Sequence, residues 1–228
     1  MISDAESGDI QRYVCLGDIV GYNADPAACL DLVQGLDCPV IKGNHDEAAT
    51  LTCDLPHFNP LAMKGVEYSR RALKPEKLAY LQCLPMTLGF RGFAVVHATM
   101  YQPQNWQYVY SHEEVWQCIQ FQPGRLCFIG HTHSPMIYFE EAGRINVVEM
   151  KSNTSIPIDL ESKRRYLVNV GSVGQPRDGD WRACYVIFDD GKNTIEFRRL
   201  SYNINATKKR ITEVALPEIL SQRLSLGR

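Results

Sequence analysis

Short apolar runs alternate with capped amphipathic stretches along the chain. Residues 12–16 and 38–42 have the pattern of buried strands, and each run is followed by glycine and a polar residue. Between them, Asp25 supplies a helix N-cap, Pro26 fits the first helical position and Gly35 is a stop signal. The pattern therefore predicts a βαβ unit, whose two strands run parallel.

The same signals recur through the rest of the chain. Helices are predicted from Asn59-Pro60 to Ala72, from Lys74-Pro75 to about Leu84, from Ser111 to about Gln120, and near 216–224. Ser111 and Glu114 form a capping box at the start of the third helix. Strands are predicted at 87–91, 93–97, 126–129, 136–140, 144–150, 165–170, 182–188 and 194–200. Helices early and strands late predict an α/β fold of two packed sheets with helices outside. Neither a repeat nor a linker divides the chain, so we expect a single domain over residues 1–228.

Composition narrows the class of protein. The 228 residues are 45% hydrophobic and 22% charged, with a net charge of −2, which argues against a strong nucleic-acid-binding surface. Apolar runs are shorter than the ~18–20 residues that span a bilayer, and residues 1–6 do not resemble a signal peptide. The eight cysteines are widely spaced without a CxxC pair, which indicates reduced thiols. We therefore expect a cytoplasmic protein that does not associate with membranes.

Polar residues follow the ends of several predicted strands. They are Gly17-Asp18, Gly43-Asn44-His45-Asp46, His97 and Gly130-His131-Thr132-His133. Ligands bind at the carboxyl edge of α/β sheets, and carboxylate, amide and imidazole donors suit divalent Mn²⁺, Fe²⁺ or Zn²⁺. Four of the six histidines lie in these segments, and the other two, His57 and His112, are expected to be exposed.

The spacing within these segments has physical reasons. A glycine precedes Asp18, Asn44 and His131, which allows the sharp turn that a ligand next to an ion needs. If their segment is extended, His131 and His133 point the same way. The two oxygens of Asp18 can bridge two cations about 3.5–4 Å apart, which would activate a water and neutralise a phosphoryl group. Each motif alone also fits an ordinary turn or helix cap, whereas the whole set in this order favours a metal site.

The motifs GD at 17–18, GNHD at 43–46, the strand ending in His97 and GHTH at 130–133 resemble those of the calcineurin-like metallophosphoesterase superfamily. Segments 16–22 and 169–178 are similar to its small prokaryotic phosphodiesterase branch. The resemblance implies a four-layer αββα sandwich of two packed mixed sheets. It also implies hydrolysis of a phosphomonoester or phosphodiester by a metal-bound hydroxide at a binuclear site.

The resemblance also implies roles for individual residues in binding two divalent metal ions. Asp18 would bridge the two ions, Asn44, His97 and His131 would complete one ion's ligands, and His133 would bind the other. Mn²⁺ is the expected metal, with Fe²⁺, Zn²⁺ and Ni²⁺ as alternatives.

Further roles concern catalysis and the substrate. His45, held by Asp46, would donate a proton to the leaving oxygen or stabilise the transition state, and Arg177 would lie near the phosphate of a small phosphorylated substrate. The aromatic side chains of residues 99–112 could stack on a base or aryl group, or simply cover the sheet edge.

The chain departs from the family at the first motif, Asp-x-His after the first strand. Asp4 fits the aspartate, but Glu6 stands where the histidine is expected. Residues 5–11 are also too few for the ~10–12 residues of a parallel crossover. Three explanations of this departure stay open. The chain is a truncation whose first metal site is weakened, the sequence omits a stretch between Asp4 and Arg12, or Glu6 replaces the histidine with an oxygen ligand.

Because the first motif is broken, we expect the chain as written to hold one ion firmly and the second weakly or not at all. Two rival functions therefore stay open beside hydrolysis. One is a catalytically impaired phosphoesterase scaffold that binds a ligand or protein. The other is a one-metal sensor that uses the ligand set containing Asp18 and His131.

Overall fold

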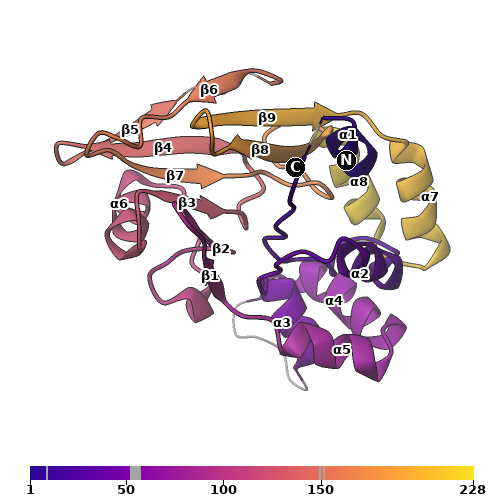
Figure 1. The fold of residues 1–228 in the computed structure, drawn as a ribbon. Coiled ribbons are helices and arrows are strands. Elements are labelled where there is room, and N and C mark those ends of the chain that lie inside the picture. The colour runs from indigo at the N-terminus through magenta and orange to yellow at the C-terminus, as the bar shows by residue number, and fades with distance from the viewer. Residues whose placement is uncertain (9, 52–57, 149, 151) are drawn as a thin grey trace.

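The computed structural model describes residues 1–8, 10–51, 58–148, 150 and 152–228 (Figure 1). Its helices are α1 (Ile2–Glu6), α2 (Pro26–Gly35), α3 (Asn44–Thr50), α4 (Pro60–Ala72), α5 (Pro75–Gln82), α6 (His112–Phe121), α7 (Ile204–Glu213), α8 (Glu218–Leu226) and a 3-10 turn at Pro103–Asn105. Its strands are β1 (Thr87–Gly89), β2 (Ala94–Val96), β3 (Leu126–Ile129), β4 (Met136–Glu141), β5 (Arg144–Val148), β6 (Ser155–Pro157), β7 (Arg165–Asn169), β8 (Ala183–Asp189) and β9 (Thr194–Leu200). The predicted helices that begin after a cap are confirmed as α2, α4, α5 and α6.

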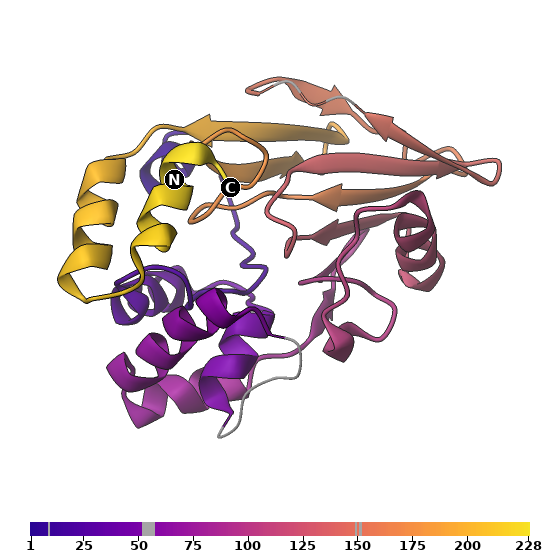
Figure 2. The same cartoon turned by 180° about the vertical axis from the view of Figure 1, so that it is seen from behind.

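The strands form two sheets. The larger has the order β1-β2-β3-β7-β4-β5, in which β2, β3 and β7 are parallel and the other pairings are antiparallel. The smaller sheet, β6-β9-β8, is antiparallel. Figures 1 and 2 show the sheets stacked, with α6 on the outer side of the larger one. The predicted α/β class with two packed sheets and outer helices is confirmed, and only the larger sheet is mixed as predicted, because both pairings of the smaller one are antiparallel.

Alternate residues of the central strands enter two different cores. Val95 and Phe128 point toward the smaller sheet, where they meet a cluster that includes Phe197. Their neighbours Val96 and Cys127 point the other way, into the cluster under α6. Because successive side chains of a strand alternate between faces, a strand buried on both faces has a continuous apolar sequence. This burial explains the short apolar runs of the sequence.

The first predicted βαβ unit forms only in part. The expected strands 12–16 and 38–42 are reduced to a single parallel bridge between Cys15 and Val40. The parallel direction agrees with the prediction, but the ladder does not continue, because after Ile41 N, which donates to Cys15 O, the next N–H on that side is that of Gly43, which donates to the Asp46 carboxylate at 3.0 Å. The sequence pattern also did not predict α1, α3, β6 or α7.

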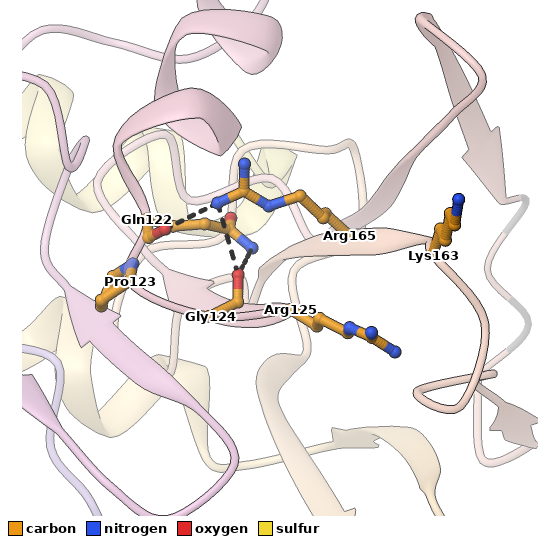
Figure 3. Close-up of a pocket in the computed structure, with 6 residues that line it drawn as sticks. All are labelled: Gln122, Pro123, Gly124, Arg125, Lys163 and Arg165. Carbon is orange, nitrogen blue, oxygen red and sulfur yellow. Dashed lines mark hydrogen bonds between the residues drawn. The ribbon is translucent and has the colours of Figure 1, made fainter.

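Local hydrogen bonds define both ends of α6. Ser111 and Glu114 form the predicted capping box at its start. At its other end, Arg165 donates to the carbonyl oxygens of Gln122 at 2.6 Å and Gly124 at 3.5 Å (Figure 3). The basic recess in Figure 3 therefore owes part of its shape to a guanidinium that binds the carbonyls after a helix.

Other sequence predictions have simple outcomes. His112 is exposed as expected, whereas His57 lies outside the described residues. In the described part of the chain the cysteines are free; Cys53 lies outside it. The described helices are too short or too polar to cross a membrane.

Candidate metal centre

Two glycines bring the first two motifs into contact. Gly17 and Asp18 both have left-handed backbone, with φ of 85° and 54°. A Cβ on Gly17 would lie 2.4 Å from Gly43 N, and a Cβ on Gly43 would lie 2.1 Å from Asp18 Oδ1. Neither distance is possible between real atoms, so both turns require glycine, as the spacing predicted.

The Asp46 side chain holds these turns together. Its carboxylate accepts hydrogen bonds from the main-chain N–H groups of Asp18 at 2.8 Å, Ile19 at 3.0 Å, Val20 at 3.4 Å and Gly43 at 3.0 Å. We predicted that Asp46 holds the His45 imidazole, but its carboxylate binds these main-chain N–H groups instead. Because four N–H groups surround the carboxylate, Asp46 positions the loop that carries Asp18.

Asp18, His97 and His131 come together at the carboxyl ends of their segments. One possible ligand atom from each lies within 4.8 Å of the others, and His97 Nε2 is 3.4 Å from Asp18 Oδ2. Within the described part of the chain, His97 Nε2, His131 Nε2 and Asn44 Oδ1 are buried without a hydrogen-bond partner. Buried polar atoms normally have partners, so these atoms fit a bound cation. They provide the oxygen and nitrogen donors that a borderline divalent metal prefers.

The other ring nitrogen of two candidate histidine ligands is bound to the main chain. Nδ1 of His97 donates to Leu16 O at 2.7 Å, and Nδ1 of His133 donates to Gln175 O at 2.7 Å. A bond of this kind fixes the tautomer and leaves Nε2 as the free acceptor. The rings are thus oriented as metal-binding histidines usually are.

The backbone at the two late histidines differs from the sequence expectation. His131 and His133 have φ of 63° and 60°, so their segment is not extended. The condition under which the two side chains were expected to point the same way is therefore not met. Left-handed backbone at non-glycine residues is strained and is concentrated at functional sites.

Burial and neighbouring charges set the protonation states. Burial tends to raise the pKa of Asp18, but His97 and the other nearby imidazoles outweigh it and hold the pKa well below its usual range. Burial opposes the charge on His97, but Asp18 raises the pKa of His97 overall. Burial, with His97, lowers the pKa of His131 to about 3, and burial lowers the pKa of His133 and His45 as well. The lowered pKa values of His131 and His133 favour the neutral imidazole that binds metal, whereas His97, whose pKa is raised, has to lose its proton to bind an ion.

His45 lies beside this group with Tyr22. The two rings are 4.4 Å apart between centroids, and His45 Nδ1 has no partner in the described part of the chain. Gly21 makes room for His45, since a Cβ there would lie 2.2 Å from Nδ1. Sequence reasoning did not select Tyr22; its only signal was its place in segment 16–22, four residues after Asp18.

Arg177 lies next to His133. Its main-chain N–H donates to His133 O at 3.1 Å. Its guanidinium donates through Nη2 to Tyr22 OH at 3.0 Å and to Gln175 Oε1 at 3.0 Å. The predicted placement of Arg177 beside the late histidines is therefore the one the structure has.

Asp4 does not lie in this group. It belongs to α1, where its carboxylate accepts a hydrogen bond from Tyr185 OH and lies 3.7 Å from Arg198 Nη1. Glu6 is exposed at the end of the same helix. The segment forms a helix against β8 and β9 instead of a strand of the larger sheet, so neither residue occupies the place of the Asp-x-His motif.

Comparisons with known proteins agree with this geometry. Residues 1–192 match the calcineurin-like phosphoesterase superfamily domain. The chain is 36% identical to an uncharacterised protein of Methanocaldococcus jannaschii in an alignment of 234 residues. This alignment covers 100% of this chain and 91% of the relative. A metallophosphoesterase from Sphaerobacter thermophilus has a similar structure, with TM-score 0.87, 35% identity, and coverage of 100% of this chain and 91% of that one. A hypothetical protein from Pyrococcus horikoshii OT3 shares the fold at TM-score 0.78 and 17% identity, with 100% and 90% covered.

Proposed function

Because the chain belongs to the calcineurin-like phosphoesterase superfamily, we propose that it hydrolyses a phosphomonoester or phosphodiester with divalent metal ions. The observation that most supports this is the convergence of Asp18, His97 and His131 with the unpartnered Oδ1 of Asn44. Three of these donor atoms, on Asn44, His97 and His131, are buried without a hydrogen-bond partner in the described part of the chain, and Asp18 Oδ1 accepts from His45 N at 2.9 Å. A metal ion would satisfy them together.

These four residues would hold one ion. Asp18 and His133 are available to a second ion, and Mn²⁺ is the metal we propose, with Fe²⁺, Zn²⁺ or Ni²⁺ as alternatives. When bound, such ions activate water and neutralise charge on a phosphoryl group. Burial excludes bulk water from the group, which strengthens every electrostatic interaction there.

Two side chains beside the metal centre would act on the substrate. His45 lies in the first turn of α3 without a partner for Nδ1, so it is free to turn one N–H toward the leaving or non-bridging oxygen. Arg177 is fixed by Tyr22 and Gln175 through Nε and Nη2. Its Nη1 is left to bind a phosphate oxygen by a charge-assisted hydrogen bond.

Metal-dependent turnover tests this function. The protein is treated with chelator, dialysed and assayed with an aryl phosphodiester and an aryl phosphomonoester at increasing Mn²⁺. We expect turnover that rises with Mn²⁺, is abolished in Asp18→Asn and is unchanged in Asp190→Asn, an exposed control. Turnover absent at all Mn²⁺ concentrations would contradict the proposal.

One observation favours a second candidate function. Of the residues proposed as ligands, Asp18 and His133 remain for a second ion, because the three-residue cluster of the described chain contains neither His133 nor Asp4, and Asp4 is bound to Tyr185. A chain with one firmly held ion could bind a phosphorylated ligand without hydrolysing it. Binding of inorganic phosphate that requires metal, together with absent turnover, would support this scaffold function over the enzyme.

A further inference from the structure

Aromatic rings extend from the metal centre to the protein surface. The ring of Tyr108 stacks on the His131 imidazole, with centroids 4.1 Å apart and planes at 23°. The ring of Tyr110 is nearly parallel to that of Tyr108, at 5.4 Å and 12°. Tyr108 is 41% exposed and Tyr110 is 57% exposed. An apolar ring face is thus available to a ligand within a short distance of a candidate metal ligand.

The exposure of Tyr108 and Tyr110 is not explained by a role in covering the edge of the sheet. Val109, between them, is 3% exposed and packs in the core under α6. Because Val109 anchors the segment, the two tyrosines could face solvent as polar residues without loss of core packing. Their exposure therefore needs another explanation, and exposed apolar groups at a site commonly mark a binding surface.

The main chain that carries the rings is held in place. Glu114 Oε2 accepts from Tyr110 N and Ser111 N, both at 2.8 Å, which ties Tyr110 to the start of α6. On the other side, Trp106 has left-handed φ of 53°, its N–H donates to Pro103 O at 3.2 Å, and its ring lies edge-on to the His97 imidazole with centroids 6.0 Å apart. A ring on a fixed main chain loses little entropy when a ligand stacks on it.

Cationic groups complete the entrance. The guanidinium carbon of Arg177 lies 5.4 Å from the centre of the Tyr22 ring, and that of Arg223, from α8, lies 5.9 Å from it. Arg177 forms no ion pair with an Asp or Glu within 4.0 Å in the described part of the chain, whereas Arg223 Nε donates to Arg228 O at 3.0 Å. The entrance therefore combines ring faces with the unneutralised charge of Arg177, which suits a molecule that carries both an aromatic ring and phosphate.

We propose that Tyr108 and Tyr110 form a stacking subsite for an aromatic group of the substrate, so that the natural substrate is a phosphoester of a nucleoside or another aromatic alcohol. This inference rests on the proposed phosphoester hydrolysis, because it places the phosphate at the metal centre. The ring stacks on the exposed tyrosine face while Arg177 binds a phosphate oxygen. Tyr110 determines specificity, and it takes no part in bond cleavage.

Phosphonates test the subsite without turnover, because their P–C bond is not hydrolysed. Titration calorimetry of the Mn²⁺-loaded protein compares methylphosphonate, phenylphosphonate and the 5′-methylenephosphonate analogue of AMP. Base stacking on an aromatic side chain is worth about tenfold to a hundredfold in affinity. We expect at least one aromatic ligand to bind about tenfold or more tightly than methylphosphonate. A preference for the AMP analogue identifies a nucleoside, and equal binding of both identifies a simple aryl group.

Variants assign the preference to the tyrosines. Tyr110→Leu should bring the aromatic-to-methyl affinity ratio toward one, whereas Tyr110→Phe should keep it. Phe121→Leu, which removes a ring of matched exposure (56%) at the far end of α6, should also keep it.

Three outcomes would overturn the subsite: a ratio near one in the unaltered protein, a ratio unchanged in both Tyr110→Leu and Tyr108→Leu, or no binding by any of the three ligands. These outcomes are separate from the proposed hydrolysis. A ratio near one with Mn²⁺-dependent turnover intact defeats the subsite alone, whereas absent turnover with a high ratio defeats the enzyme alone.

Discussion

The carboxylate of Asp46 accepts a hydrogen bond from the main-chain N–H of Asp18 at 2.8 Å. The same carboxylate oxygen also accepts from Gly43 N at 3.0 Å. Asp46 is fully buried, and Asp18 is held in a left-handed conformation that a free chain rarely adopts. The position of the candidate bridging carboxylate therefore depends on a second carboxylate that has no place among the candidate ligands.

Replacing Asp46 by asparagine should destabilise the protein and weaken metal binding. One acceptor oxygen becomes an NH₂ group that faces main-chain N–H donors, so buried donors lose their partner. We expect a loss of about 2–4 kcal/mol in the free energy of unfolding, measured by urea denaturation. Asp190→Asn, on the surface, is the matched control. A stable Asp46→Asn variant that keeps full metal affinity would show that the loop does not need this carboxylate.

Metal stoichiometry should reveal two unequal sites. Asp18, Asn44, His97 and His131 provide one complete ligand set, so calorimetry of the chelator-treated protein should show about one tight ion per chain. His131→Ala removes a ligand itself, so it should lower the affinity for that ion by more than the roughly 10–100-fold lost when a residue that only hydrogen-bonds a ligand is replaced. His133→Ala should leave the tight ion bound. Two tight ions per chain would mean that another residue completes the second set.

Loss of the Arg177 guanidinium should weaken phosphate binding. Arg177→Ala should raise the inhibition constant for inorganic phosphate by roughly tenfold, because a charge-assisted hydrogen bond contributes about 1.5–3 kcal/mol. Metal content should be unchanged, since Arg177 donates to Tyr22 and Gln175 and is not a ligand. The exposed Arg91 provides a control of the same charge. Equal phosphate inhibition of Arg177→Ala and Arg91→Ala would remove Arg177 from the site.

His45→Ala should affect substrates according to their leaving groups. If His45 assists the departing oxygen, poor leaving groups should lose about 10²–10⁴ in rate, and acidic phenols should lose much less. Metal content should be retained, because Asn44, not His45, contributes the unpartnered oxygen. The measurement is kcat for a series of aryl esters of graded leaving-group pKa. Equal losses across the series would assign His45 a role other than leaving-group assistance.

The Glu114 capping box should give a pH-dependent contribution to stability. Burial tends to raise the pKa of Glu114, but the hydrogen bonds from Ser111 and Tyr110 together outweigh burial and lower this pKa below its ordinary value of 4.5. A lowered folded-state pKa stabilises the fold above pH 4.5, and this contribution is lost as the pH falls through the folded-state value.

The variant Glu114→Gln tests this contribution. It should be less stable than the unaltered protein at pH 7, and the difference should shrink below about pH 4.5. Urea unfolding at several pH values measures the difference, with Glu113→Gln as the neighbouring control. A difference that is constant with pH would exclude ionised Glu114 as its source.

Helix boundaries were largely predictable from the sequence. Asn59 accepts hydrogen bonds from Leu61 N and Ala62 N, and Ser111 accepts one from Glu114 N, as their spacing predicted. These interactions span three residues or fewer, so the local sequence contains both partners. The apolar runs of β2 and β3 were equally visible in the local sequence, because a strand buried on both faces is apolar at successive positions.

The early strands and the first motif were not predictable in the same way. The apolar run at 12–16 fits a strand, but a ladder needs a partner along its whole length, and pairing is limited to Cys15 and Val40. Asp4 has the residue type of a ligand, yet its segment forms a helix. There the Asp4 carboxylate accepts a hydrogen bond from the hydroxyl of Tyr185, 181 residues later. Local patterns contain no information about partners at such separations.

For the candidate metal centre, the sequence by itself determined which residue types follow the strand ends, that glycines allow the turns, and that the order of motifs resembles one superfamily. Only the tertiary structure decided that Asp46 binds the main chain of residues 18–20 and that Leu16 O, 81 residues away, orients His97. The physical reason is that a side chain's chemistry is set by its own atoms. Its orientation and pKa are set by groups that the packed chain brings beside it.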